Sequence, residues 1–238
     1  TRWWSGTTPP AWRSFWTKPN DDESEMMAVA ERRRSEGALR LAEALRAHPV
    51  IAAVRDEQRL DEALRSHSRT VFLLSTSLGR LREVSEAVAA AGKLLFIHLD
   101  FVGGLGRDDE AVEYLAQVAR PAGLITTRTG LIQTVRRLGL TPLQRLFLLD
   151  SQSLTTGIEA ARSSRAEVVE VLPGIIPRAV QAIRSQLPNT LIIAGGLVRT
   201  PREVGRALQA GASGISTSSA ELWNTDPDAF LAAAQQEP

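Results

Sequence analysis

The chain has 238 residues, of which 43% are hydrophobic and 23% are charged. This is the composition of a globular protein, and the length suits one large domain or two small ones. The lack of cysteine excludes disulfides, thiolate metal sites and cysteine nucleophiles. A net charge of +1 shows no overall attraction to nucleic acid, and no apolar run reaches the ~18 residues that a membrane span needs.

Residues 1–26 differ from the rest of the chain. Tryptophan and proline are concentrated there, at Trp3, Trp4, Pro9, Pro10, Trp12, Trp16 and Pro19. No helical or strand period runs through this stretch, so we predict a flexible leader. A single domain is expected over residues 27–238, and it opens with a helical pattern from Met27 to Ala47.

Short runs of β-branched residues and leucine then recur along the chain. They occur at Val50–Val54, Val71–Leu74, Leu94–Leu99, Leu124–Thr127, Leu146–Leu149, Val168–Leu172, Leu191–Ala194 and Gly214–Thr217. Each gap between them holds an amphipathic helical pattern. Strands that alternate with helices pair in parallel, so we predict a compact (β/α)8 TIM-like barrel with short loops. An open doubly wound sheet with fewer strands is the alternative.

Residues typical of helix ends agree with this alternation. Thr200 and Glu203 form a capping box at the start of a helix. Gly92, Gly139 and Gly211 each follow a helical pattern, where a left-handed end favours glycine.

Polar residues cluster where the predicted strands end. A TIM barrel builds its site at these carboxyl ends. The charged candidates there are Arg55, His98, Asp100, Arg128, Asp150 and Glu170. His98 and Asp100 are two apart in one strand, so they point to the same side. A salt-bridge network that merely closes the barrel, such as Arg128 with Asp150, is the alternative to ligand binding. We favour ligand binding because such a network leaves the neighbouring glycine and hydroxyl loops unexplained.

These loops follow the last two strands. Gly195 and Gly196 end one strand, and Ser216, Thr217 and Ser218 end the next. Glycine lets the backbone approach an anion closely, and free amides with hydroxyl donors hold its oxygens. TIM barrels commonly bind phosphate at this position, so we predict a phosphate site here. A tight strand-to-helix turn without a ligand is the alternative for the two glycines.

The scarcity of lysine and histidine limits the chemistry. Lys93 falls at the start of a strand, so a Schiff-base aldolase lacks its lysine at the working end. His98 is the only histidine at a strand end, which disfavours a multi-histidine metal site. We expect no metal and no catalytic residue. An enzyme that acts on a small phosphorylated polyol or sugar, with His98 or Glu170 as acid or base, remains the alternative.

The strand-end segments carry a family resemblance. The segments are residues 49–55, 98–100, 123–128, 144–151, 170–174, 194–197, 216–218 and 222–223. In this order they resemble the glycerol-3-phosphate-responsive antiterminators, which are regulatory proteins of glycerol uptake operons. Residues 75–79 depart from the more acidic or glycine-containing segment expected of the family, and the leader is not part of its pattern.

The resemblance implies a function. It implies a cytoplasmic TIM-like barrel that binds glycerol 3-phosphate as its effector and uses no other cofactor. In the liganded state the protein would act on the leader messenger RNA of glycerol catabolic genes, prevent termination and promote expression. The resemblance leaves oligomerisation open. No aromatic RNA-binding motif and no strongly basic domain are visible in the sequence, so the RNA role rests on the resemblance alone.

Overall fold

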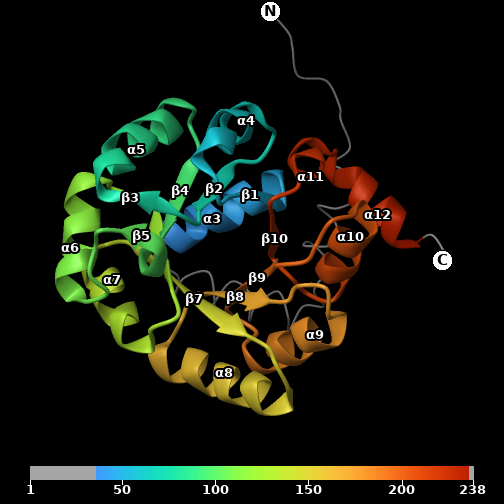
Figure 1. Ribbon diagram of the computed structural model, residues 1–238. Coiled ribbons are helices and arrows are strands. Elements are labelled where there is room, and N and C mark those ends of the chain that lie inside the picture. The colour runs from blue at the N-terminus through green and yellow to red at the C-terminus, as the bar shows by residue number, and fades with distance from the viewer. Residues whose placement is uncertain (1–35, 236–238) are drawn as a thin grey trace, which may run out of the picture.

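The computed structural model describes residues 36–235. The predictions for the leader and for residues 27–35 lie outside this range. Eight parallel strands close into a barrel in the order β1-β10-β9-β8-β7-β6-β4-β2, which confirms the (β/α)8 prediction (Figure 1). The barrel strands are β1 (Val50–Val54), β2 (Thr70–Leu73), β4 (Leu94–His98), β6 (Gly123–Thr126), β7 (Thr141–Phe147), β8 (Val168–Leu172), β9 (Leu191–Gly195) and β10 (Gly214–Thr217).

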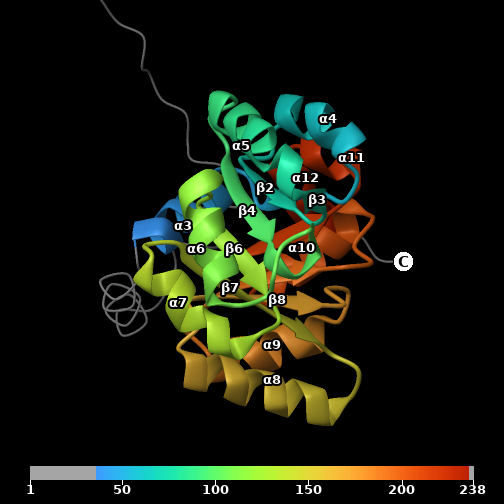
Figure 2. The same ribbon diagram turned by 60° about the vertical axis from the view of Figure 1, so that its left-hand side comes forward.

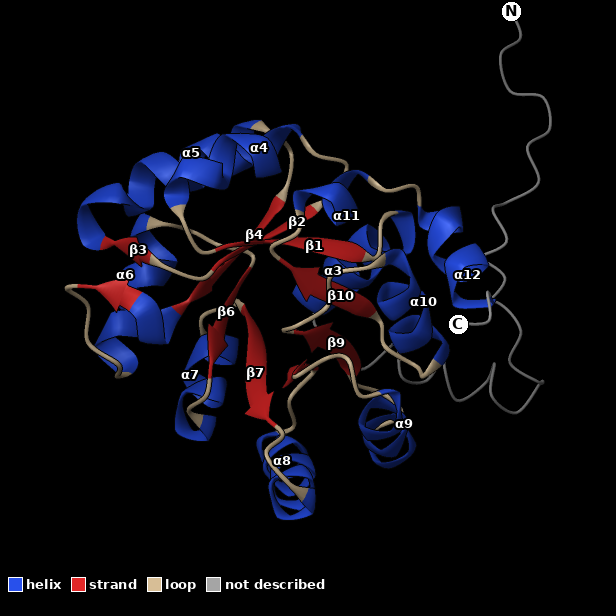
Figure 3. Ribbon diagram, turned by 45° about the vertical axis from the view of Figure 1, so that its right-hand side comes forward, coloured by secondary structure: helices blue, strands red, loops and turns tan. Residues whose placement is uncertain are grey.

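Helices surround this ring of strands, as Figure 3 shows. They are α3 (Glu36–Ala47), α4 (Leu60–Arg65), α5 (Leu81–Ala90), α6 (Asp109–Val118), α7 (Ile132–Arg137), α8 (Ser151–Ser164), α9 (Pro177–Gln186), α10 (Pro201–Gln209), α11 (Ala220–Asn224) and α12 (Pro227–Gln235). Short 3₁₀ turns are η1 (Glu57–Arg59), η2 (Leu78–Arg80), η3 (Leu99–Phe101) and η4 (Thr129–Leu131).

Helix α3 closes one end of the barrel. Its buried Leu41 and Leu45 pack in one cluster with strand side chains such as Ile51, Phe72 and Phe96. These strand residues share one parity along their strands, which places them inside the ring. Figure 2 shows α3 at the end where the strands begin. The interior is therefore filled at that end, and only the carboxyl ends of the strands are left to form a site.

The other parity of each strand faces the surrounding helices. Val71 and Leu73 of β2 belong to one buried cluster with Leu81, Val84 and Val88 of α5. Fully burying such a side chain contributes about 1.5–3 kcal/mol. Both faces of every barrel strand are thus covered, which explains why the strands are continuous apolar runs in the sequence.

Strand β7 is longer than predicted. It covers Thr141–Phe147, whereas the sequence predicted 146–149. Gln144 and Arg145 interrupt the apolar pattern, yet both are buried, because the Gln144 side chain bonds Ser164 and Arg145 bonds Glu170. Because these buried residues are polar and hydrogen-bonded, the strand lacks the continuous apolar pattern by which the other strands were predicted.

A second, two-stranded sheet was not predicted. Strand β3 (Thr76–Ser77) pairs in parallel with β5 (Val102–Gly103). These strands follow β2 and β4, so the pair extends the carboxyl end of the barrel beyond the main ring. The connection between β4 and α6, which contains η3 and β5, is accordingly longer than the short loops that we expected.

Helix ends follow the predicted rules. Thr200 accepts from the N–H of Glu203, and the Glu203 carboxylate accepts from the N–H of Thr200, which completes the capping box. Gly92, Gly139 and Gly211 all have positive φ, as predicted. Among residues 36–235, no helix is long and apolar enough to cross a membrane.

Candidate functional site

A buried ion pair lies inside the barrel near the carboxyl ends of the strands. Arg145 of β7 donates from Nε to Oε2 of Glu170 of β8 at 2.7 Å. The Ser216 hydroxyl of β10 donates to Oε1 of Glu170 at 2.5 Å. The Arg145 side chain is 7% exposed and the Glu170 side chain is 2% exposed. A buried pair is tolerated only when its charges are fully hydrogen-bonded, and both oxygens of Glu170 are.

Gly195 makes this arrangement sterically feasible. It lies on β9, between β8 and β10 in the ring. A Cβ atom at this position would collide with the Ser216 hydroxyl and would lie 2.7 Å from Oε1 of Glu170. Glycine therefore brings two side chains from non-adjacent strands into contact across β9. The sequence predicted Gly195 as a phosphate contact, and the structure gives it this additional packing role.

His98 of β4 is buried in the same interior. Its side chain is 1% exposed, and neither ring nitrogen has a hydrogen-bond partner within the described part of the chain. Burial, with the nearby Arg145 charge, lowers the pKa of His98 to about 4. The imidazole is therefore neutral at pH 7, with one donor and one acceptor unused. Phe101, whose ring centroid lies 4.6 Å from that of His98, covers it on one side.

Asp100 lies beside His98, as the sequence predicted. Its Oδ2 atom is 3.8 Å from Nδ1 of His98, an approach that is not an ion pair while the imidazole is neutral. The Thr127 N–H and hydroxyl both donate to Oδ2, at 3.0 and 3.2 Å. Its Oδ1 atom is buried without a hydrogen bond, although Nε of Arg128 lies 3.4 Å away. Asp100 therefore keeps acceptor capacity beside two unused imidazole nitrogens.

The turns after β9 and β10 present unused backbone N–H groups. Gly196 and Leu197 have φ values of +74° and +65°. Leucine adopts such a φ at a cost of order 1–3 kcal/mol, so the surrounding structure must impose it. Among the described residues, no hydrogen bond uses the N–H of Gly196, Leu197 or Ser218. The two turns thus offer N–H groups that could donate hydrogen bonds to a bound anion.

Side chains hold these turns in place. The Thr217 hydroxyl donates to the Val198 carbonyl at 2.7 Å, and the indole N–H of Trp223 donates to the Thr217 carbonyl at 2.7 Å. Arg59 donates to the Ser218 carbonyl and also lies 4.9 Å from the Trp223 ring. The Thr217 hydroxyl is therefore used within the protein, so this residue supports the turns rather than offering its side chain.

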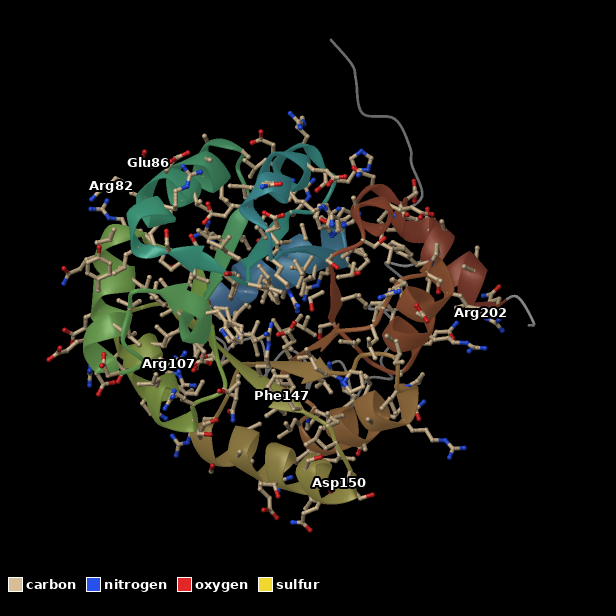
Figure 4. The ribbon with its side chains drawn as sticks, in the orientation of Figure 1. Arg82, Glu86, Arg107, Phe147, Asp150 and Arg202 are labelled. Carbon is tan, nitrogen blue, oxygen red and sulfur yellow. The ribbon has the colours of Figure 1, made fainter. Side chains whose placement is uncertain are left out.

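Asp150 and Arg55, which were also predicted as site residues, lie apart from this interior. Asp150 is the N-cap of α8: the Ser153 N–H donates to it at 2.8 Å and lowers the pKa of its carboxyl. It is exposed and lies beside α8, away from the centre of the ring (Figure 4). Arg128 approaches Asp100 and not Asp150, so the network proposed as the alternative is not formed as expected. Arg55 is exposed after β1 and forms no ion pair with a described residue.

Arg145 is the site residue that the sequence reasoning missed. The sequence does contain an indication of its role: Arg145 has no acidic neighbour and stands in a largely apolar run. Such a charge is costly to bury unless it has a partner. The described residues contain no group of three or more His, Asp or Glu side chains that could hold a metal ion.

The comparisons with known proteins identify the family. A family model described as glycerol-3-phosphate responsive antiterminator matches residues 50–223. The chain belongs to this family. It is 34% identical to the glycerol uptake operon antiterminator-related protein of Thermotoga maritima, with a TM-score of 0.66 over 73% of this chain and 96% of that one. The glycerol uptake operon antiterminator regulatory protein of Listeria monocytogenes is 31% identical, with a TM-score of 0.71 over 74% of this chain and 95% of that one.

One further relative is similar in sequence, and one solved structure is similar in fold alone. The Escherichia coli K12 protein YgcP is 30% identical over 179 residues, which are 75% of this chain and 93% of YgcP. An aldolase, QR15, is similar in structure with a TM-score of 0.61 at 14% identity. At that identity the likeness shows only a shared barrel. The matched region ends with Trp223, the residue that holds the β10 turn.

Proposed function

We propose that this antiterminator-family chain binds glycerol 3-phosphate inside the carboxyl end of its barrel, and that the liganded protein binds the leader RNA of glycerol catabolic genes in the cytoplasm. RNA binding in that state would prevent termination and promote expression. The observation that carries the proposal is the set of unused polar groups at this end. Buried His98 and Asp100 have free hydrogen-bonding atoms, and the turns after β9 and β10 have free N–H groups.

The phosphate ester of a three-carbon polyol matches these two sets of groups. The N–H groups of Gly196, Leu197 and Ser218 would donate to the phosphate oxygens, as backbone amides do in other phosphate sites. Neutral His98 can donate to one glycerol hydroxyl and accept from another, and Oδ1 of Asp100 can accept from either. Filling buried atoms that lack partners is favourable, because each unsatisfied group costs about 1–3 kcal/mol.

We propose binding and not catalysis for this site. A general acid or base works best with a pKa near the operating pH, and a pKa of about 4 leaves His98 without a proton to give at pH 7. Both oxygens of Glu170 are engaged by Arg145 and Ser216, so this carboxylate has no free position for proton transfer. Ligand recovered unchanged after prolonged incubation with the protein would support this assignment.

The experiment that tests the function measures leader-RNA affinity with and without glycerol 3-phosphate. Coupling between an effector and a partner is typically ~1–3 kcal/mol, so we expect saturating effector to tighten RNA binding by roughly 5- to 150-fold. Glycerol together with inorganic phosphate serves as the control, because it supplies both chemical parts without the ester. Equal RNA affinity in all conditions would contradict the proposal.

A further inference from the structure

The two ends of the barrel differ in charge. All barrel strands run the same way, so every connection from a helix to the next strand emerges at the end where the strands begin. These connections carry Arg69, Lys93, Arg120 and Arg165, and among the described residues Glu167 is their single carboxylate. The connections from strands to helices, at the opposite end, carry both signs, with Arg55, Asp56, Asp100, Arg107, Asp108, Arg128, Asp150 and Arg199.

Further cations join this end from the last turns of the helices. We define the basic crescent as Arg65, Arg69, Lys93, Arg120, Arg137, Arg162 and Arg165. These residues precede β2, β4, β6, β7 and β8, which are consecutive in the ring. A helix dipole favours cations in a last turn, which accounts for Arg65, Arg137 and Arg162. It does not account for the cations in the connections or for the near absence of acidic residues.

Within residues 36–235, the charges of the basic crescent are not neutralised by acidic side chains. None of its members forms an ion pair with a residue in the range 36–235, and Glu167 is engaged by Arg136 instead. Burial and the charge of Arg69 lower the pKa of Lys93. Burial lowers the pKa of His48, and the charges of His67 and Lys93 lower it further. Positive groups therefore repel one another here, and the repulsion would be relieved by a bound polyanion.

Two members of the basic crescent, Arg120 and Arg165, have a left-handed backbone, with φ values of +44° and +54°. Arg165 stands at the end of α8. Its N–H bonds the carbonyl three residues earlier, and the next N–H bonds the carbonyl five residues before it. Gly92, Gly139 and Gly211 make the same two bonds at the ends of α5, α7 and α10. Arginine thus stands at the end of α8 where these three helices use glycine, and the hydrogen bonds of the helix end do not require an arginine.

A hollow of about 280 Å³ lies beside Arg165, at the foot of α8 and α9. Arg162, Gln186 and Asn189 also line it. The Arg162 guanidinium donates to the Gln186 side chain at 2.9 Å and to its backbone carbonyl. Guanidinium groups bind phosphate oxygens, and side-chain amides bind base edges. The hollow therefore offers a recess with guanidinium and amide groups on an otherwise largely apolar wall, within the positively charged end.

From the charge distribution, the left-handed Arg165 and this hollow, we propose that the RNA partner docks on the basic crescent, at the barrel end opposite the proposed effector site. This inference rests on the proposed function, since it names the surface that the RNA occupies. Effector and RNA then bind at opposite ends of the barrel, so the effector acts on RNA through the barrel and not by direct contact.

The experiment compares two charge-matched variants of the full chain. Arg69→Gln/Arg165→Gln removes two exposed charges from the basic crescent, and Arg82→Gln/Arg107→Gln removes two exposed charges from the opposite end (Figure 4). Fluorescence anisotropy measures binding of the labelled glycerol-operon leader transcript over a salt series, with glycerol 3-phosphate present. Calorimetry measures the effector affinity of each variant.

We expect the basic-crescent variant to bind RNA at least ~10-fold more weakly, with a salt dependence reduced by about one to two phosphate contacts. The opposite-end variant should keep its RNA affinity within about 2-fold, since charges outside the contact surface act only weakly through salt. Both should keep their effector affinity. Arg165→Gly should also weaken RNA binding while its thermal midpoint does not fall, which separates lost contact from lost folding.

Two results would overturn the inference, and they are distinguishable. If the opposite-end variant loses RNA affinity while the basic-crescent variant keeps it, the docking surface is wrong and the proposed function stands. If the unaltered protein binds the leader transcript in neither effector state, the proposed function fails and the docking surface fails with it.

Discussion

The two ends of the barrel differ in whether their charged side chains are buried and paired or exposed and of one sign. At the carboxyl end, Arg145 and Glu170 are buried, paired and enclosed with the neutral His98. At the other end, the basic crescent carries one sign of charge and has no acidic partner among the residues that the structure describes. An enclosed set of directed polar groups suits a small ligand of defined shape, whereas exposed charges of one sign suit an extended polyanion. Because all strands run the same way, the proposed small-ligand site lies at one end of the barrel and the proposed polyanion surface lies at the other.

The largest expected difference between the two ends is in stability, when one charge is removed from each. Arg145→Met leaves the Glu170 carboxylate buried without its partner, so we expect the free energy of unfolding to fall by about 3–5 kcal/mol. Arg69→Met removes an exposed charge and should change it by less than about 0.5 kcal/mol. Urea unfolding of both variants measures the difference.

The double variant Arg145→Met/Glu170→Met serves as the control for the buried pair. It removes both charges, so most of the lost stability should return. A single Arg145→Met variant as stable as the unaltered protein would show that the pair is not buried as described.

The phosphate site is tested by adding a charge at a glycine with positive φ at each end. Gly196→Asp places a carboxylate against the phosphate, so affinity for glycerol 3-phosphate should fall at least ~100-fold, since like charges in contact cost several kcal/mol. Gly139→Asp has nearly the same backbone strain, with φ of +77° compared with +74°, but lies at the other end. Calorimetric titration of both proteins gives the comparison.

Gly139→Asp should keep its effector affinity. If both variants lose effector binding equally, the loss comes from strain at a glycine and not from the phosphate site. If Gly196→Asp binds the effector normally, the N–H groups of the β9 turn do not hold the phosphate.

The neutral state of His98 predicts a pH dependence of stability. Its pKa is about 4 when folded and 6.5 when exposed, so the unfolded chain binds more protons between these values. Stability contributed by the neutral ring is therefore complete above pH 6.5 and is lost as the pH falls toward 4. At pH 5 the loss from this residue is about 2 kcal/mol.

His98→Gln removes this contribution while it keeps a polar side chain. The variant should lose about 2 kcal/mol less than the unaltered protein between pH 7 and pH 5, measured by urea unfolding at each pH. His48 contributes in the same direction in both proteins, because burial also lowers its pKa, so it cancels in the comparison. Identical pH profiles would show that His98 is not buried in neutral form.

The smallest expected effect concerns the strained arginine. Arg165→Gly relieves the left-handed backbone, so we expect the free energy of unfolding to rise by about 0.5–1 kcal/mol. Gly139→Ala, at the equivalent position of α7, should lower it by a similar amount. Thermal unfolding measures both, and a less stable Arg165→Gly variant would show that arginine is kept there for the fold.

The sequence predicted most of the barrel because its strands are buried on both faces. Strands β1, β8 and β10 begin and end where their apolar runs do. The periodic signal failed at β7, where Arg145 is buried by virtue of a partner on another strand. Pairing between distant strands leaves no local trace, which is why the β3–β5 sheet was also not predicted.

The site was predicted less fully than the fold. His98, Asp100, Glu170 and Ser216 come together as the strand ends suggested, since the closed barrel leaves them no other direction. Asp150 illustrates the difficulty, because an aspartate that caps a helix and one that faces a ligand have the same sequence context. Only the placement of the Ser153 N–H distinguishes these two roles.

The most direct test of the proposed effector site is a crystal structure of the protein soaked with glycerol 3-phosphate. We expect the phosphate to lie against the N–H groups of Gly196, Leu197 and Ser218, with a glycerol hydroxyl within hydrogen-bond distance of His98. A saturating soak that leaves this space empty, or that places the ester elsewhere, would contradict it.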